Sequence, residues 1–231
     1  MRTYAKSLST IALAGALALS ASACGSSSDD EAATSSSSSS AAAPEPTAAP
    51  TPAAQLSDLS KGKTTAVTLD AGFVQALMTL KLTPAPDGKA TISKAGVATF
   101  PITGGNATYY DPASGVTPYV QGKIDHKGSG LSLTGGGKKV VLGNFVVDPG
   151  TSMLTGDVSV NGKTAAKGAD LFTLDGTTLK PLSMEGTDAI LEGTKVEISP
   201  AAAELLNTPF GTTAVKPGLL VGIAKITLAT A

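Results

Sequence analysis

Hydrophobic and polar residues alternate in short runs along most of the chain from about residue 56 onward. A period of two places successive side chains on opposite faces of a β-strand, so one face of each run can be buried. Four runs rich in β-branched residues are therefore predicted to be strands: Val97 to Ile102, Val116 to His126, Lys139 to Val147 and Leu219 to Leu228.

Glycine-containing turn signals separate these runs. Asn-Gly and Asp-Gly suit the positive φ angles of two-residue hairpin turns. Frequent turns without regularly alternating helices indicate antiparallel strands. We predict a mainly β fold, a single antiparallel β-sandwich or barrel-like domain with one or two short helices. The turn signals are Asp87-Gly88, Gly104-Gly105-Asn106, Gly135-Gly136-Gly137, Asp148-Pro149-Gly150, Asn161-Gly162 and Asp175-Gly176.

Two segments have a helical pattern instead. Asp70 can cap a helix whose apolar residues share one face, namely Phe73, Val74, Leu77 and Met78. Met78 is therefore expected in the core. Ser199-Pro200 is a typical helix start and predicts a second short helix that ends near Pro209. This second helix is expected to turn two leucines inward, Leu205 and Leu206.

The first 23 residues form a separate class of segment, because they contain Arg2 and Lys6 but no acid. Their apolar core, IALAGALAL, is well below the roughly 20 residues that a membrane-spanning helix needs. Residues 1–23 are therefore predicted to be a signal peptide. The next residue is Cys24, and Ala21-Ser22-Ala23-Cys24 resembles the lipobox of bacterial lipoproteins. That resemblance implies a lipid-modified, palmitate-bearing Cys24; the alternative is an ordinary secretory leader with a chance cysteine.

Residues 24–55 form a Ser-, Ala- and Pro-rich segment with almost no large apolar side chain. Such a composition cannot offset the entropy of folding, so a disordered tether is expected. Residues 56–231 would be the β domain. The whole protein is then extracytoplasmic and held by its lipid at the outer face of the cytoplasmic membrane, which is its first expected partner.

Composition excludes several function classes. The chain has one Cys, one His and no Trp, and its 17 Lys+Arg nearly balance 18 Asp+Glu. The only arginine is Arg2, so a nucleic-acid partner is not expected. A lone histidine and a lone cysteine build neither a disulfide framework nor a zinc site. No metal site is predicted.

His126 is the one residue that invites a chemical role. Strand periodicity puts it on the apolar face, whereas Asp125 falls on the opposite face and cannot orient it for a catalytic triad. No Gly-x-Ser-x-Gly motif is present. We therefore predict no catalytic residue and no enzyme. His126 could be a ligand, a proton carrier or a packed histidine bound to a backbone carbonyl.

The order of segments resembles HtaA-like, haem-transport-associated domains of actinobacterial surface proteins. The similarity covers most of residues 67–228. The matching segments are Val67 to Leu80, the Gly-x-x-x-His-x-Gly element Gly122 to Gly128, the Leu131 and Leu133 strand, Asn144 to Pro149, Leu154 to Val158, Asp170 to Asp175 and Pro217 to Gly222.

This resemblance implies a β-rich domain that binds haem through an iron-ligating tyrosine, supported by the histidine of the glycine element. The histidine corresponds to His126, but the tyrosine position is occupied by Ala76. A haem site would then use His126 with one of the three tyrosines of the domain, Tyr109, Tyr110 or Tyr119. Two alternatives remain open: another hydrophobic ligand, or a structural or adhesive cell-envelope role without haem.

The lipid anchor gives the first prediction. Cys24→Ser removes the only thiol that can carry the lipid, so the variant should move from the membrane fraction to the medium. Fractionation and labelled-palmitate incorporation in a bacterial host measure this. A variant that stays membrane-bound, beside a wild type that takes up no label, would refute the anchor.

Overall fold

The computed structural model describes residues 49–230. The signal peptide, Cys24 and the tether up to residue 48 lie outside the described residues. The described part contains thirteen strands, two α-helices and one short 3-10 helix. In chain order these are β1 (Ala54–Leu56), β2 (Thr64–Leu69), α1 (Ala71–Thr79), β3 (Thr83–Gly88), β4 (Thr91–Ile92), β5 (Val97–Pro101), β6 (Gly104–Tyr109), η1 (Pro112–Ser114), β7 (Val120–Gly135), β8 (Lys138–Asp148), β9 (Met153–Val160), β10 (Lys163–Asp175), β11 (Ser183–Glu185), β12 (Asp188–Ile198), α2 (Pro200–Phe210) and β13 (Leu220–Ala229).

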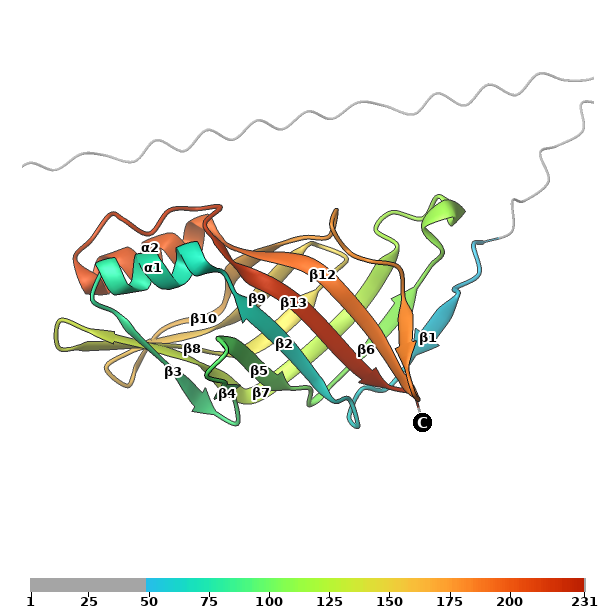
Figure 1. The fold of residues 1–231 in the computed structure, drawn as a ribbon, viewed down its shortest axis with the longest axis horizontal. Helices are drawn as coiled ribbons and strands as arrows, with labels where there is room; N and C mark the ends of the chain where they lie inside the picture. The colour runs from blue at the N-terminus through green and yellow to red at the C-terminus, as the bar shows by residue number, and fades with distance from the viewer. Residues whose placement is uncertain (1–48, 231) are drawn as a thin grey trace, which may run out of the picture. The chain divides into compact units, whose positions relative to one another are not determined.

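All strands belong to one curled antiparallel sheet, which confirms the mainly β prediction (Figure 1). Its strand order is β1-β6-β7-β8-β9-β10-β12-β13-β2-β5-β4, with β11 paired to β12 and β3 paired to β7. β1 occupies the last residues of the predicted tether, and Ala53 N–H donates to the Tyr109 carbonyl at 2.8 Å. The described fold therefore begins slightly before residue 56.

The curl brings the two ends of this strand order together. β5 leads into β6 through Ile102 and Thr103, and the Thr103 N–H donates to the Asp125 carbonyl on β7 at 2.8 Å. Thr103 Oγ1 donates to the same carbonyl at 3.0 Å and accepts from Lys127 N–H at 2.9 Å. β6 pairs with residues 120–125 of β7, and β3 pairs with residues 129–134 further along the same strand. β7 is thus the strand on which the sheet closes.

The turn predictions were right where a two-residue turn that contains glycine joins two long strands. Gly136-Gly137 connects β7 to β8, and Asn161-Gly162 connects β9 to β10, all four residues having positive φ. Gly104-Gly105-Asn106 was wrongly predicted as a turn, since it begins strand β6. A Cβ on Gly105 would lie 1.9 Å from the Lys123 carbonyl oxygen, so this glycine permits close strand pairing rather than a turn.

The predicted strand 116–126 also needed correction. The strand β7 starts only at Val120 and continues past His126 to Gly135. The glycine element after His126 forms a bulge, in which residues 127–129 face a single residue, Asn144, on β8. Similar register shifts occur between β8 and β9, where residues 144–145 face Gly156, and between β9 and β10, where residues 167–168 face Asp157. Four neighbouring strands therefore share one line of irregular pairing.

Asn144 holds this line together. Its Oδ1 accepts from Gly128 N–H at 2.9 Å, and its Nδ2 donates to Asp157 Oδ2 at 3.0 Å. The other oxygen of Asp157 accepts from Gly168 N–H at 3.0 Å. These hydrogen bonds, that of Asn144 first, lower the pKa of the Asp157 carboxyl. Side chains thus replace the ladder hydrogen bonds that the bulges remove.

The two helices begin where the sequence predicts. The Asp70 side chain accepts from the amides of Gly72 and Phe73, and Ser199 Oγ accepts from Ala202 N–H. Met78 was wrongly assigned to the core, because its side chain is 59% exposed. The second helix continues through Pro209 and ends at Gly211, in the left-handed conformation. No helix within residues 49–230 is long and apolar enough to span a membrane.

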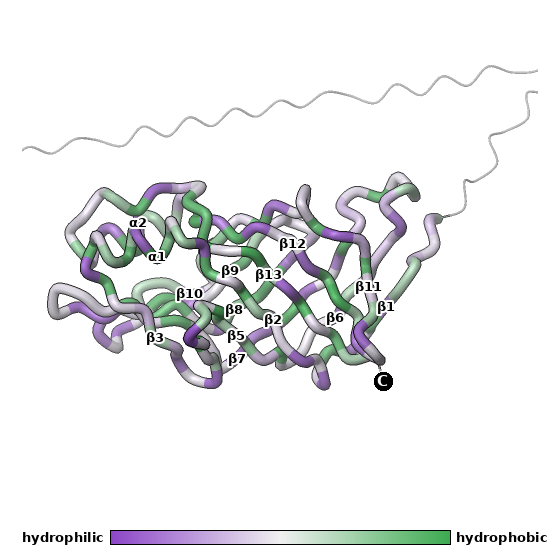
Figure 2. Tube along the Cα trace, viewed as in Figure 1, coloured by the Kyte–Doolittle hydropathy of each residue, from purple (hydrophilic) through white to green (hydrophobic). Residues whose placement is uncertain are grey.

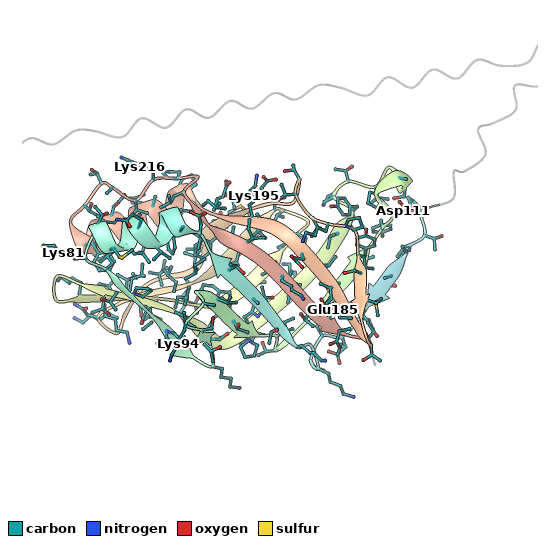
Figure 3. The ribbon with its side chains drawn as sticks, viewed as in Figure 1. Lys81, Lys94, Asp111, Glu185, Lys195 and Lys216 are labelled. Carbon is teal, nitrogen blue, oxygen red and sulfur yellow. The ribbon has the colours of Figure 1, made fainter. Side chains whose placement is uncertain are left out.

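Three of the five phenylalanines meet inside the curled sheet. Phe145 contacts Phe100 and Phe172 edge to face, with ring centroids 5.4 and 6.2 Å apart. Hydrophobic and hydrophilic positions alternate along the surrounding strands (Figure 2). Charged side chains such as Lys81, Lys94 and Asp111 lie at the periphery (Figure 3). The interior is therefore apolar and aromatic at this level of the sheet.

The bulge line generates a prediction about Asn144, whose φ is +52°. Asn144→Gly keeps the backbone conformation but removes both side-chain hydrogen bonds, so the free energy of unfolding should fall by about 1–2 kcal/mol. Asn144→Ala should cost about 1 kcal/mol more, because alanine is strained at positive φ. Urea unfolding measures both variants. Wild-type stability in Asn144→Gly would show that the network contributes nothing.

Candidate functional site

A cavity of about 340 Å³ lies inside the curled sheet. Side chains of eight strands form its walls, and most of them are aliphatic. These wall residues are Thr65 and Val67 of β2, Ala107 of β6, Val120, Gln121 and Ile124 of β7, Val147 of β8, Leu154 of β9, Leu174 of β10, Leu191, Thr194 and Val196 of β12, and Ala224 and Ile226 of β13. The cavity therefore draws on nearly the whole strand order, rather than on one hairpin.

Three connecting segments, together with Asn106 on β6, supply the remaining lining. They are the residues before β7, the turn between β8 and β9, and the segment after β10, contributing Thr117 to Tyr119, Pro149 and Ser152, and Gly176, Thr177 and Leu179. The rings of Tyr109 and Tyr119 meet edge to face at 5.9 Å. The Tyr109 hydroxyl also accepts a long hydrogen bond, 3.5 Å, from Leu182 N–H. Tyr109 therefore connects two of the three segments.

None of the described residues that line the cavity carries a charge. The charged groups next to lining residues are paired with each other outside. Lys195 Nζ lies 3.3 Å from Asp175 Oδ2, and Lys123 Nζ lies 3.9 Å from Asp148 Oδ2. Hydrogen bonds from Thr177 and then Lys195 lower the pKa of Asp175, which keeps it ionised. The cavity thus offers apolar contact and a few neutral hydrogen-bonding groups.

A second, much smaller cavity of about 40 Å³ adjoins the main one. The side of the main cavity that faces it is called the floor. The two share five lining residues: Thr65, Val67, Val147, Leu154 and Val196. The phenylalanine cluster and His126 surround the smaller cavity. Thr65 therefore stands between the main cavity and His126.

His126 is 1% exposed, and both its ring nitrogens have partners. Nδ1 lies 3.0 Å from the Pro101 carbonyl oxygen on β5, and Nε2 lies 3.1 Å from Thr65 Oγ1 on β2. A carbonyl oxygen only accepts, so Nδ1 carries the proton and Nε2 accepts from the threonine hydroxyl. The expectation that His126 faces inward is confirmed, and the interpretation as a histidine bonded to a backbone carbonyl describes its environment.

Burial lowers the pKa of His126. Its hydrogen bond to the Pro101 carbonyl and the charge of Asp125 act in the opposite direction but more weakly. The imidazole is therefore neutral at neutral pH. A neutral ring matches the hydrogen-bonding pattern, because the imidazolium form could not accept from Thr65.

The neighbours of His126 do not form a catalytic arrangement. The Asp125 carboxylate lies on the other strand face and pairs with Lys127 Nζ at 3.2 Å. Ser129 Oγ donates to the backbone carbonyl of His126 at 3.0 Å, not to its ring. Among residues 49–230, no group of three or more His, Cys, Asp or Glu side chains is placed to hold a metal ion.

The four candidate haem-binding residues do not converge on one point. Tyr119 lines the main cavity, Tyr109 packs edge to face against the Tyr119 ring, and Tyr110 belongs to neither lining. His126 lines only the smaller cavity. Burial, and then the neighbouring Tyr109, raise the pKa of Tyr119, which disfavours the phenolate that iron would need. Ala76, at the position where the family has tyrosine, is on helix α1.

Sequence reasoning missed Thr65, which lies in a threonine-rich strand without any distinguishing motif. Only the pairing of β2 between β13 and β5 places it opposite His126. It also missed the cavity, because the residues that line it are scattered over more than 160 positions, from Thr65 to Ile226.

The state of His126 generates a pH prediction. In the unfolded chain the imidazole titrates near its ordinary value of about 6.5, but in the folded chain its pKa is lower. The unfolded state therefore binds the proton first, and stability should fall as pH drops below about 6.5. His126→Gln should lower stability by about 1–3 kcal/mol at pH 7.5 and lose this part of the pH dependence. Urea unfolding at pH 7.5 and 5.5 measures both effects. If the free energy of unfolding changed equally between these pH values in the wild type and in His126→Gln, the lowered pKa of His126 would be contradicted.

No protein-family model and no curated protein sequence matches this chain. Among solved structures, the C-terminal domain of HtaA from Corynebacterium glutamicum is similar at 14% identity, over 73% of this chain and 97% of that one, with a TM-score of 0.49. The haem-binding protein HtaB from the same organism is similar at 10% identity, over 76% and 96%, with a TM-score of 0.36. These matches name the same HtaA-like group that the sequence motifs resemble.

Proposed function

We propose that this protein binds an apolar ligand inside its curled sheet. The observation that carries the proposal is the cavity of about 340 Å³ with an uncharged, mostly aliphatic lining. Its volume falls in the range of roughly 300–1,000 Å³ that is typical of small-molecule sites. Apolar pockets with few polar groups bind ligands mainly through buried hydrophobic surface, at about 25 cal/mol per Å².

The charges around the cavity indicate that the part of the ligand inside it is neutral. An ionised group moved into this lining would lose water and find no opposite charge, which is strongly unfavourable. Lys195, Lys123 and Lys225, which adjoin lining residues in the sequence, are already paired with carboxylates. An anionic ligand would therefore keep its charge at the mouth and insert only its apolar part.

Haem is the specific candidate that the motif resemblance implies, and Tyr119 on the cavity wall is the observation that favours it. Iron could bind Tyr119 only as a phenolate, so the metal would have to offset the raised pKa of this side chain. His126 would take part only if Thr65 released its Nε2. An apolar ligand without a metal requires neither change.

We also propose that the binding domain is held outside the cytoplasmic membrane by lipid on Cys24. A bacterial lipoprotein with a tether of about 30 residues would present its cavity to ligands of the cell envelope. The support for this location is the leader sequence and the cysteine that follows it.

A matched pair of variants on β13 tests the cavity. Ala224 lines it, whereas the adjacent Ile223 points outward and is 36% exposed. In full-length protein carrying Cys24→Ser, Ala224→Phe should weaken binding of an apolar fluorophore by about tenfold or more, because the ring fills the cavity. Ile223→Phe adds a ring to the same strand on the outer face and should bind as the parent protein does. Fluorescence titration, with circular dichroism to confirm folding, gives the result.

Hemin titration of the same proteins, followed by visible absorption, decides between the two kinds of ligand. Saturable hemin binding that is lost in Tyr119→Phe would establish a haem site on this wall. Fluorophore binding without a saturable change in the visible absorption of hemin would favour an apolar ligand that contains no metal. If neither probe saturates in the parent protein, the binding function is wrong and the non-binding envelope role takes its place.

A further inference from the structure

Thr65 sets the hydrogen-bonding polarity at the floor of the cavity. A threonine hydroxyl has one hydrogen to donate and two lone pairs that accept. Its hydrogen is committed to His126 Nε2, at an Oγ1–Nε2 distance of 3.1 Å. What remains on the Thr65 oxygen is acceptor capacity alone.

This commitment originates outside the cavity, on β5. The Pro101 carbonyl fixes the proton of His126 on Nδ1, and this leaves Nε2 as an acceptor that only a hydroxyl hydrogen can satisfy. If Nε2 carried the proton instead, Nδ1 and the Pro101 carbonyl oxygen would face each other without a hydrogen between them, which costs about 1–3 kcal/mol. The direction of the chain from Thr65 through His126 to Pro101 is therefore fixed.

We propose that the floor of the cavity selects ligands that carry a hydroxyl donor, such as long-chain or polycyclic alcohols, over ligands of the same size that only accept hydrogen bonds. The inference rests on the proposed function and specifies the ligand class of the same cavity. Thr65 Oγ1 accepts from the ligand hydroxyl. An ether, a ketone or a carboxylate at this depth meets only another acceptor, and the carboxylate also loses its hydration without a compensating cation.

Other polar side chains also line the cavity, and two of them, Gln121 and Thr177, keep an acceptor oxygen while their donors are used elsewhere. The Gln121 side chain donates to the Pro118 carbonyl at 3.1 Å, and Thr177 Oγ1 donates to Asp175 at 2.6 Å. Both contacts involve the connecting segments rather than Thr65, so the behaviour of Thr65→Val is what assigns the preference to the floor. Thr194 lines the wall on β12 without contacting His126, which makes it a matched control for Thr65.

The experiment uses n-decanol and its methyl ether, which differ in whether the oxygen can donate. In full-length protein carrying Cys24→Ser, each compound displaces the bound apolar fluorophore. The alcohol should bind about 3- to 10-fold more tightly than the ether, beyond their difference in partitioning into octanol. Decanoate should bind more weakly than either compound.

Three variants locate the preference. Thr65→Val keeps the shape but removes the acceptor, so alcohol and ether should bind alike; Thr65→Ser and Thr194→Val should both retain the preference for the alcohol. Equal alcohol and ether affinities in the parent protein would overturn the inference while leaving the apolar cavity intact. A preference that survives in Thr65→Val, or one that disappears in Thr65→Ser, would also overturn it. If Thr65→Val fails to fold, the parent ratio and the serine variant still decide. Failure of all compounds to displace the fluorophore, or absence of fluorophore binding, would instead count against the proposed function.

Discussion

Together with the bonds of Thr103 to β7, the hydrogen bonds of one buried imidazole hold the curled sheet closed. His126 lies on β7, whereas its partners Thr65 and Pro101 lie on β2 and β5, near the other end of the strand order. β2 and β5 form no ladder with β7, which pairs with β6, β3 and β8; a backbone bond crosses the gap only from Thr103, just after β5, to Asp125. A buried polar ring is tolerable only when both nitrogens are satisfied. The same two bonds that satisfy the ring therefore draw the opposite walls of the sheet together.

The distribution of large side chains then decides where space remains. Phe100, Phe145 and Phe172 gather around His126 and leave only about 40 Å³ among them. On the other side of Thr65 the inward positions include alanines, Ala107 and Ala224, together with aliphatic residues, and the cavity there is about 340 Å³. A sheet of this curvature, closed by short bonds at one level, cannot collapse further at the next. The cavity follows from closure at His126 and from small residues beyond it.

Local signals in the sequence predicted what local interactions determine. Asp70 and Ser199 cap helices, and Asn161-Gly162 turns a hairpin, because each acts on its own few backbone groups. The errors arose where distant segments decide: Gly105 serves a close strand contact, and Met78 is exposed because the sheet does not cover that side of its helix. The inward position of His126 followed from periodicity. Its partner Thr65 could not be foreseen, because no local pattern encodes the pairing of β2 with β5 and β13.

Closure of the sheet and ligation of a metal compete for the same atom. Nε2 of His126 is the only ring nitrogen that could face the cavity, since Nδ1 holds its proton against the Pro101 carbonyl. Binding of iron at Nε2 would expel the Thr65 hydrogen and leave that hydroxyl to find another acceptor among aliphatic neighbours. The cost, about 1–3 kcal/mol for a buried polar group without a partner, would fall on the bond that joins β7 to β2. A ligand that donates a hydroxyl hydrogen to Thr65 Oγ1 leaves the bond between Thr65 and His126 intact. The stability of the fold therefore favours a neutral, hydroxyl-bearing ligand over a metal at the histidine.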